Sequence, residues 1–341
     1  MKIGIVGYQG SGKSTLFEWL TGTPANPALA HTSQSAMATV IDPRVQPLCD
    51  IYAPKKVTHA AMELVDTPGL SRTHEGSAQK LAAIREAGCL VMVVAAYGGA
   101  DAQADLQRFE EDLLIADLDV MGGRIERLRE QTKKPRPNRE ELAQELAALE
   151  PLLPHLESGK LLRELELSPD QKRAIKSFQL FSEKPRFVLI NVADDETDVA
   201  QFEKLVPDGT PMAAVSLSLQ MDLARMEPEE RAAFCAEMQV QGADRDEVVR
   251  RILDASGQML FFTAGEKEVR TWMIHKGGTA VDAAGNIHTD LAKGFIRAEV
   301  MQCSDLFRLG SEREIKANGL MRQEHKEYVI RDGDILLIRH N

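Results

Sequence analysis

A glycine-rich run near the N-terminus constrains this chain more than any other feature. Residues 7–14 read GYQGSGKS and match the phosphate-binding pattern G-x-x-x-x-G-K-[ST]. Residues 2–6 predict a buried strand before the run, and residues 14–20 predict a helix after it. A strand, a glycine loop and a helix in this order present backbone N–H groups and a helix dipole to phosphate oxygens. The run therefore predicts a P-loop that binds a nucleotide.

The residues of this loop have separate expected roles. We expect the Lys13 ammonium to reach the outer phosphates as a catalytic group, and the Ser14 hydroxyl to bind Mg²⁺. The other nucleotide-binding residues expected in the loop are Gly7, Gln9, Gly10, Ser11, Gly12 and Thr15.

A second motif is typical of switch proteins rather than of P-loop proteins in general. Residues 61–65 predict a strand, and Asp-Thr-Pro-Gly follows it at 66–69. Asp66 can hold the Mg²⁺ shell, and the catalytic role expected of Gly69 is to sense a γ-phosphate with its N–H. Leu70 stands where Ras-type GTPases carry a glutamine that orients the attacking water. Either another group positions that water, or hydrolysis is slow without a partner.

Charge and cysteine content limit the compartment and the partners. The net charge of −11 argues against bulk electrostatic binding of nucleic acid, so any RNA contact is expected to be local. The four cysteines are scattered without a C-x-x-C pair, as in a reduced cytoplasmic protein. The longest apolar run, residues 87–97, is too short to span a membrane. We expect a cytoplasmic protein with no signal peptide and no membrane contact.

Alternating strand and helix patterns predict an α/β fold with a doubly wound sheet. The strands are expected at residues 2–6, 61–66, 89–96, 186–191 and 211–217. The long gap between the third and the fourth of these strands indicates an insertion in the nucleotide-binding domain.

The insertion has the pattern of a helical hairpin. Apolar residues recur at spacings of three and four in 114–128 and again in 142–153, on either side of a basic, proline-containing turn at 132–138. This pattern predicts two helices folded back as an antiparallel coiled coil with a basic tip. The glycine pair at 122–123 and Pro151 are expected to bend or shorten it.

From about residue 260 the pattern changes to short strands. Residues 269–274 alternate like a half-buried strand. Residues 328–330 and 335–338 flank Asp-Gly-Asp at 332–334, which predicts a β-hairpin.

The predicted strand at 186–191 ends in a candidate base-reading motif, Asn-Val-Ala-Asp. G proteins read guanine with N-K-x-D at this place, where the aspartate accepts from groups that adenine does not offer. Asn191 and Asp194 match that motif, whereas Val192 replaces its lysine. The alternative is a polar turn after a strand. We expect these three residues, together with Ser216, to line the base site.

The chain resembles the YchF (Obg-like ATPase) family of P-loop NTPases over nearly its full length. The resemblance rests on the P-loop, on Asp-Pro-Arg at 42–44, on residues 66–70, on Ala-Asp-Leu-Asp at 116–119 and, most specifically, on residues 262–298. It implies a G domain formed by residues 1–102 plus 184–258, a helical coiled-coil insertion at 103–183, and a C-terminal TGS domain, a β-grasp module, at 259–341.

The same resemblance implies a function. Members of the family hydrolyse nucleotide slowly, usually prefer ATP, and associate with ribosomes and stress responses. It therefore implies Mg²⁺ and either ATP or GTP as ligands of a low-rate hydrolase. The implied partner is the ribosome or a ribosomal subunit, contacted through the TGS domain and the coiled-coil hairpin of a monomer.

Several residues depart from the family pattern. Gly10 replaces an asparagine, and Asp194 replaces a glutamate, which moves the base motif back towards guanine. Residues 97–100 lack a histidine that members often carry, and His74 is the available substitute. The switch I threonine that would complete the Mg²⁺ shell is assigned to Thr32, with Ser33 and Thr39 as rivals.

Three functions fit the sequence. The first is a nucleotide-dependent switch, which we favour because two spaced motifs precede two appended modules. The second is a nucleotide-stabilised adaptor with negligible turnover, which Leu70 favours. The third, a small-molecule kinase, fits the P-loop but not the loop at 66–69 or the C-terminal module.

Overall fold

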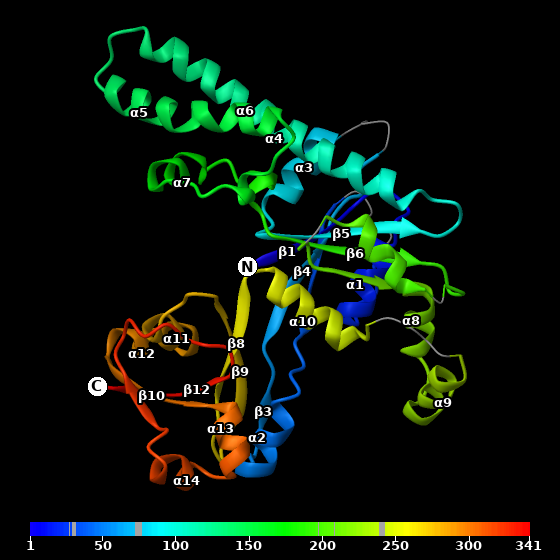
Figure 1. The fold of residues 1–341 in the computed structure, drawn as a ribbon, viewed down its shortest axis with the longest axis vertical. Helices are drawn as coiled ribbons and strands as arrows, with labels where there is room; N and C mark the ends of the chain where they lie inside the picture. The colour runs from blue at the N-terminus through cyan, green and yellow to red at the C-terminus, as the bar shows by residue number, and fades with distance from the viewer. Residues whose placement is uncertain (27, 29–31, 72–76, 197, 208, 239–242) are drawn as a thin grey trace. The chain divides into compact units, whose positions relative to one another are not determined.

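The computed structural model describes residues 1–341 except 27, 29–31, 72–76, 197, 208 and 239–242. The chain divides into two compact units (Figure 1). The first unit holds residues 1–36 and 63–243, and the second holds residues 37–62 and 244–341.

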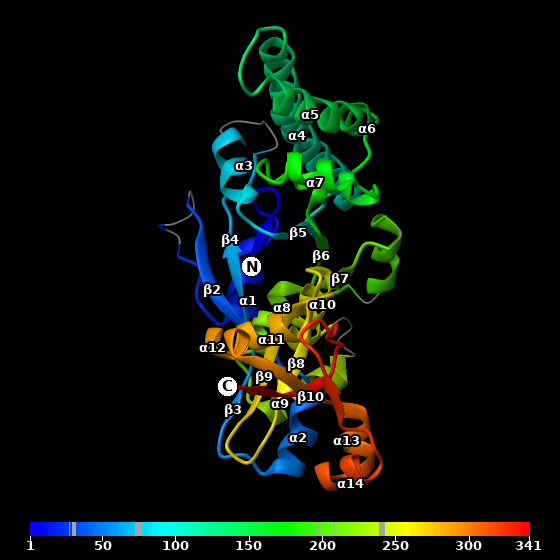
Figure 2. The same ribbon diagram turned by 90° about the vertical axis from the view of Figure 1, so that its left-hand side faces the viewer.

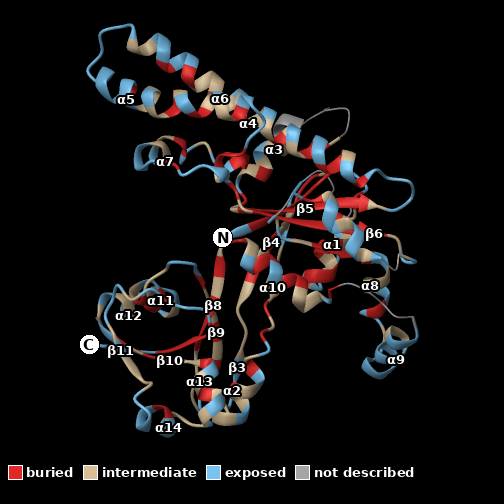
Figure 3. Cartoon of the chain, in the orientation of Figure 1, coloured by how far each residue is buried: buried red, intermediate tan, exposed pale blue. Residues whose placement is uncertain are grey.

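A six-stranded sheet with the order β2-β4-β1-β5-β6-β7 forms the centre of the first unit. Its strands are β1 (Lys2–Val6), β2 (Gln34–Thr39), β4 (Ala61–Asp66), β5 (Cys89–Ala96), β6 (Arg186–Val192) and β7 (Met212–Val215). β1 pairs in parallel with β4 and β5, and the parallel pairing continues through β6 to β7. β5 and β6 are buried almost throughout, as the central strands of a doubly wound sheet must be (Figure 3). The predicted α/β fold is confirmed.

Helices connect these strands because parallel neighbours require crossover connections. Those of the nucleotide-binding part are α1 (Lys13–Thr21), α3 (Ser77–Arg85), η5 (Val199–Leu205), α8 (Leu217–Leu223) and α9 (Pro228–Met238). Those of the insertion are α4 (Ala102–Thr132), α5 (Arg139–Leu149), η2 (Glu150–Leu152), α6 (Leu153–Glu157), η3 (Leu162–Glu164), α7 (Pro169–Ile175) and η4 (Phe181–Glu183).

The insertion is the predicted antiparallel hairpin. α4 runs away from the sheet, and α5 and α6 return beside it in both ribbon views (Figure 2). The predicted apolar stripe forms a core of its own that includes Met121, Ile125, Leu128 and Leu149. The glycine pair at 122–123 does not shorten the hairpin, because α4 continues through both glycines. Each glycine costs a helix about 1 kcal/mol, which the burial of Met121 and Ile125 on either side offsets. At Pro151 the second helix is interrupted as predicted, since α5 ends at Leu149 and the 3-10 turn η2 separates it from α6.

The second unit contains another six-stranded sheet, with the order β11-β10-β12-β8-β9-β3. Its strands are β3 (Val57–Thr58), β8 (Gln258–Thr263), β9 (Val269–His275), β10 (Phe295–Gln302), β11 (Arg322–Glu324) and β12 (Asp334–His340). Its helices are α2 (Val45–Tyr52), α10 (Arg245–Ala255), α11 (Ala280–Ile287), α12 (Thr289–Lys293), α13 (Cys303–Leu309) and α14 (Glu312–Ala317). Alanines of α11 pack on Phe261, Val300 and Leu336, so one helix covers one face of a mixed sheet, as in a β-grasp module.

The β-hairpin predicted at 328–338 was wrong. β12 pairs antiparallel with β10 and parallel with β8. Residues 328–330 form no strand, and Val329 makes only a bridge to Thr279. Non-local pairing with two other strands therefore overrides the local turn signal of the sequence.

The two compact units divide the chain at other positions than the expected domains, whose bounds stay predictions. Residues 37–62, expected in the nucleotide-binding domain, belong to the second unit together with residues 244–258. Arg44 anchors this early segment: its guanidinium lies 2.6 Å from Asp332 and 2.8 Å from Asp42, and 5.0 Å from the ring of Phe262. These contacts attach the segment to the C-terminal unit through the buried Asp42 and Phe262 and the exposed Asp332.

Candidate nucleotide-binding site

The P-loop lies between β1 and α1, where the sequence predicts it. Gly12 caps α1 in the left-handed region at φ +99°, and a Cβ on it would collide with the Asn191 amide. Gly7, at φ +147°, would collide with the Val93 carbonyl. Both positions therefore require glycine, which lets the loop carry its N–H groups towards a phosphate.

Lys13 is buried beneath this loop and is 7% exposed. Its Nζ donates to the Tyr8 carbonyl at 2.7 Å. Burial lowers the pKa of Lys13 to about 8, against the opposing effect of the Asp66 carboxylate. A phosphate competes with the Tyr8 carbonyl for the same ammonium, and its charge favours the protonated form.

Ser14 and Asp66 meet at the end of β4. The Ser14 hydroxyl donates to Asp66 Oδ2 at 2.7 Å, and burial raises the pKa of Asp66 despite this bond and the nearby Lys13. Asp66 Oδ1 is buried without a hydrogen-bond partner among the described residues. In the described ranges no three His, Cys, Asp or Glu residues gather around a metal position. One hydroxyl and one carboxylate fit Mg²⁺, which takes few protein ligands and completes its shell with phosphates and water.

The segment after β4 faces the P-loop. A Cβ on Gly69 would lie 2.8 Å from Lys13 Nζ, so the Gly69 backbone closely approaches the P-loop lysine. Leu70 donates its N–H to the Gly7 carbonyl at 3.2 Å and accepts from the Gln9 N–H at 3.1 Å. Its side chain is 1% exposed and belongs to the core around Tyr8. Position 70 therefore supplies no polar group that could orient a water molecule.

The other expected switch residues are less completely defined. Thr32 is exposed and lies two residues before β2. His74 lies outside the described residues. The roles of both in Mg²⁺ binding and hydrolysis stay predictions.

The base motif links three loops at one edge of the sheet. Asn191 donates from Nδ2 to the Ser11 carbonyl at 3.2 Å and accepts from the Leu217 N–H at 3.1 Å. Asp194 accepts from the Ser216 hydroxyl, which also caps α8 by accepting from the Leu219 N–H. These bonds hold the amide and the carboxylate beside the P-loop.

A cavity of about 680 Å³ opens over this motif, which is large enough for a base and a ribose. Gly12, Thr15, Asn191, Val192 and Asp194 line this cavity, whereas Ser216, also expected at the base site, is not among its wall residues. Their binding of a nucleotide stays a prediction.

Tyr97 is a wall residue that the sequence analysis missed. Its hydroxyl donates to the Gly10 carbonyl at 2.5 Å. Its position directly after β5 was the available signal, because ligands of such sheets bind beyond the carboxyl ends of the strands. Glu18 and Arg225 also line the cavity and were missed; no motif in the sequence identifies them.

A parallel sheet, a P-loop, and an aspartate and a glycine facing its lysine together define a P-loop nucleoside triphosphatase of the G-domain type. A family model described as a 50S ribosome-binding GTPase matches residues 2–121. A second model, for the C-terminal part of YchF GTPases and described as a protein of unknown function (DUF933), matches residues 259–341. The chain belongs to the YchF family.

Individual relatives support this membership over the full length. The chain is 33% identical over 357 residues to the ribosome-binding ATPase YchF of Escherichia coli O157:H7, covering 98% of each. It is 33% identical over 367 residues to Obg-like ATPase 1 of Oryza sativa subsp. japonica, covering 100% of this chain and 92% of the relative. The solved structure of the Schizosaccharomyces pombe YchF GTPase matches with a TM-score of 0.85 at 27% identity, over 99% of this chain and 97% of that one. Among the described residues, no helix combines the length and apolar character that a membrane span requires.

Proposed function

We propose that this chain is a slow, Mg²⁺-dependent ATPase or GTPase that works in the cytoplasm as a nucleotide-controlled switch on the ribosome. The observation that carries the proposal is the approach of Gly69 to the Lys13 ammonium, beside the bonded pair of Ser14 and Asp66. The proposal assigns γ-phosphate sensing to the Gly69 N–H, phosphate binding to Lys13, and metal binding to the pair beside them. Leu70 is buried beside them, which supports a low intrinsic rate because no polar side chain at this position can orient water.

The proposed roles follow the chemistry of each group. Lys13 and the P-loop N–H groups bind the outer phosphates, and Gly69 donates its N–H to the γ-phosphate. Ser14 and Asp66 hold Mg²⁺, joined by Thr32 in the triphosphate state. The ion, when bound, neutralises negative charge on the β- and γ-phosphates.

The base site carries features that suit both ATP and GTP. Asp194 lies at the edge of the cavity, where its Oδ1 accepts a hydrogen bond from the Ser216 hydroxyl. A carboxylate acceptor there favours guanine, whereas the relatives from Escherichia coli and Oryza sativa are named ATPases. We therefore keep ATP and GTP as equal alternatives.

Affinity measurements with both nucleotides test the site. Wild type and Lys13→Ala are titrated with nonhydrolysable ATP and GTP analogues in the presence of Mg²⁺, and the exposed Lys2→Ala variant serves as the control. Loss of affinity confined to Lys13→Ala is expected; equal affinity in all three proteins contradicts the proposal. In Asp194→Glu, weaker GTP binding assigns the chain to GTP, and unchanged tight ATP binding assigns it to ATP.

The ribosome is proposed as the partner because relatives carry the name ribosome-binding ATPase. The proposed contact modules are the hairpin at 103–183 and the TGS-like domain at 259–341, appended to a G domain of 1–102 plus 184–258 in a monomer. The hairpin tip carries exposed Lys133, Lys134 and Arg136, which suit a local contact with RNA phosphates despite the acidic chain. Replacing all three by alanine is expected to weaken co-sedimentation with ribosomal subunits and to leave nucleotide affinity unchanged.

A nucleotide-stabilised adaptor is the second candidate, and the burial of Leu70 favours it. In that case phosphate release stays negligible even with ribosomal subunits present, and Lys13→Ala still binds them normally. Stimulated phosphate release that Lys13→Ala loses supports the switch instead.

A further inference from the structure

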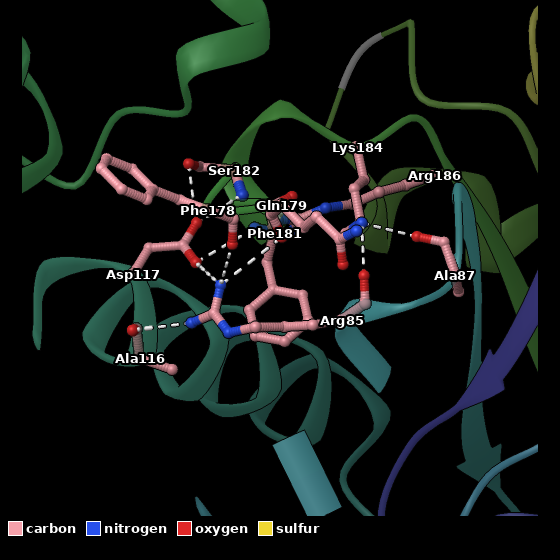
Figure 4. A network of polar contacts seen from close by, with 10 residues as sticks. All are labelled: Arg85, Ala87, Ala116, Asp117, Phe178, Gln179, Phe181, Ser182, Lys184 and Arg186. Carbon is pink, nitrogen blue, oxygen red and sulfur yellow. Dashed lines mark hydrogen bonds and ion pairs between the residues drawn. The ribbon is translucent and has the colours of Figure 1, made fainter. Parts of the chain in front are cut away.

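A buried ionic network joins the hairpin to the helix that follows the nucleotide-sensing segment (Figure 4). Asp117, in the middle of α4, is fully buried. Arg85, the last residue of α3, lies 2.9 Å from Asp117 and donates from its other terminal nitrogen to the Ala116 carbonyl at 2.8 Å. Its guanidinium also lies 4.3 Å above the ring of Phe181. Arg85 therefore contacts α4 at two consecutive residues and also contacts the returning end of the hairpin at Phe181.

The carboxylate of Asp117 closes the base of the hairpin. It accepts from the Phe181 N–H at 3.0 Å, from the Ser182 N–H at 2.7 Å and from the Ser182 hydroxyl at 2.8 Å. Lys184 extends the network by donating to the Arg85 and Ala87 carbonyls. The end of α3, the middle of α4 and the chain that leaves the hairpin are thus held at one point.

A second contact joins α4 to the P-loop itself. The Tyr8 hydroxyl donates to Asp112 at 2.8 Å, and its ring packs edge-on against Phe109 at 5.4 Å. Tyr8 also offers the carbonyl that Lys13 binds. α4 is therefore attached to the P-loop through Asp112 and to α3 through Asp117, and it continues about 22 Å beyond the second attachment at the α-helical rise.

We propose that Arg85 couples the state of the nucleotide site to the hairpin, so that α4 responds when residues 66–70, which precede α3 in the chain, bind a γ-phosphate. This inference rests on the proposed function. A movement of α3 must either carry α4 with it or break a buried ion pair with its hydrogen bonds, and the second course is costly. A small rotation at Asp117 is amplified at the hairpin tip because the hairpin, with its own core, moves as a stiff arm.

The variant that tests this coupling is Arg85→Met. Asp117 keeps its three hydrogen bonds to Phe181 and Ser182 in that variant, which favours folding. Arg85→Lys is a second variant, which retains the charge but cannot contact Asp117 and the Ala116 carbonyl with two separate nitrogens. Arg124→Met is the matched control: it removes the ion pair with Glu145 (2.6 Å), which joins α4 to α5 within the hairpin and does not involve α3.

Amide hydrogen exchange, measured by mass spectrometry with and without a nonhydrolysable ATP or GTP analogue and Mg²⁺, gives the readout. In wild type and in Arg124→Met, nucleotide is expected to change exchange by roughly threefold or more in α3, in residues 112–120 and in residues 178–184. In Arg85→Met the nucleotide-dependent change in α3 is expected to persist, whereas the change in the two hairpin segments is lost. In Arg85→Lys the change in the two hairpin segments is expected to be reduced. Nucleotide affinity is expected to stay within about twofold of wild type, because Arg85 touches no part of the nucleotide site.

Two results would overturn the inference: a hairpin response in Arg85→Met equal to that of wild type, or a wild-type response that stops at α3. A wild type that binds neither analogue would instead refute the proposed function. A purely structural role for Arg85 predicts lower stability in Arg85→Met and an unchanged nucleotide response in the hairpin.

Discussion

Nucleotide binding is predicted to take up a proton at Lys13 in alkaline solution. Burial lowers the pKa of this ammonium from 10.5 to about 8 in the free protein. A bound polyphosphate restores the charged form, because an opposite charge within a few ångströms favours it. The free protein above pH 8 therefore lacks a proton that the complex holds.

The size of the effect follows from the pKa. At pH 7 about 0.9 of the free protein carries the Lys13 ammonium, so binding takes up about 0.1 proton at this site. At pH 9 only about 0.1 carries it, so binding takes up about 0.9 proton. Each pH unit above 8 then weakens affinity about tenfold, or about 1.4 kcal/mol, up to the pKa of Lys13 in the complex.

The contribution of Lys13 to the stability of the free protein changes with pH in the direction opposite to nucleotide affinity. The unfolded chain keeps the Lys13 proton up to about pH 10.5, whereas the folded chain loses it near pH 8. Because the unfolded state binds more protons in this window, the contribution of Lys13 to stability rises as the pH rises from 8 to 10.5. Between pH 8 and 10.5, nucleotide affinity should therefore fall, whereas the contribution of Lys13 to the free energy of unfolding should not fall.

Isothermal titration calorimetry measures the uptake directly. Titrations with a nonhydrolysable triphosphate at pH 7 and pH 9, each in two buffers of different ionisation enthalpy, give the number of protons taken up. Lys80→Gln is the matched variant: Lys80 lowers the pKa of Lys13, so its removal should shift the onset of uptake to higher pH. Equal uptake at pH 7 and pH 9 would refute the argument that burial controls the charge of Lys13.

Three further substitutions give separate tests. Gly12→Ala should weaken nucleotide binding tenfold or more in a titration, because its Cβ collides with the Asn191 amide at a left-handed position; wild-type affinity would contradict this. Leu70→Gln should lower the unfolding free energy in urea by about 2 kcal/mol or more without raising phosphate release, because it buries an amide in an apolar core; faster turnover would contradict it. Asp117→Ala should cost about 3–5 kcal/mol in the same assay, because Arg85 loses its buried partner; a cost below about 1 kcal/mol would contradict it.

Local signals predicted the centre of the candidate site well. The spacing of glycines, Lys13 and Ser14 is a property of one loop, and its strand and helix lie beside it in the chain. Asp66 was predicted to join them because it ends a strand and can hold the Mg²⁺ shell, and in the structure its Oδ2 lies 2.7 Å from the Ser14 hydroxyl. The leucine stripes of the hairpin were equally predictable, since helical periodicity reports burial directly.

Features that depend on distant residues were not predictable. Nothing near Arg44 indicates that its partner is Asp332, and this pair places residues 37–62 in the C-terminal unit. The turn at 332–334 carries a strong local hairpin signal, yet β12 pairs with β10 and β8 instead. Tyr97 was missed for a related reason: a tyrosine after a strand becomes a wall of the cavity only when the P-loop folds against it.

The placement of residues 37–62 in the C-terminal unit also has a consequence for protein synthesis. Arg44 and Asp332 are 288 residues apart in the chain, so the early segment leaves the translating ribosome long before its partner exists. At 5–20 residues per second the delay is roughly 15–60 s. During this interval the residues that will form α2 and β3 have no sheet to join, and their apolar side chains remain open to chaperones or to mispairing. The C-terminal sheet is thus completed only when β12 has been made.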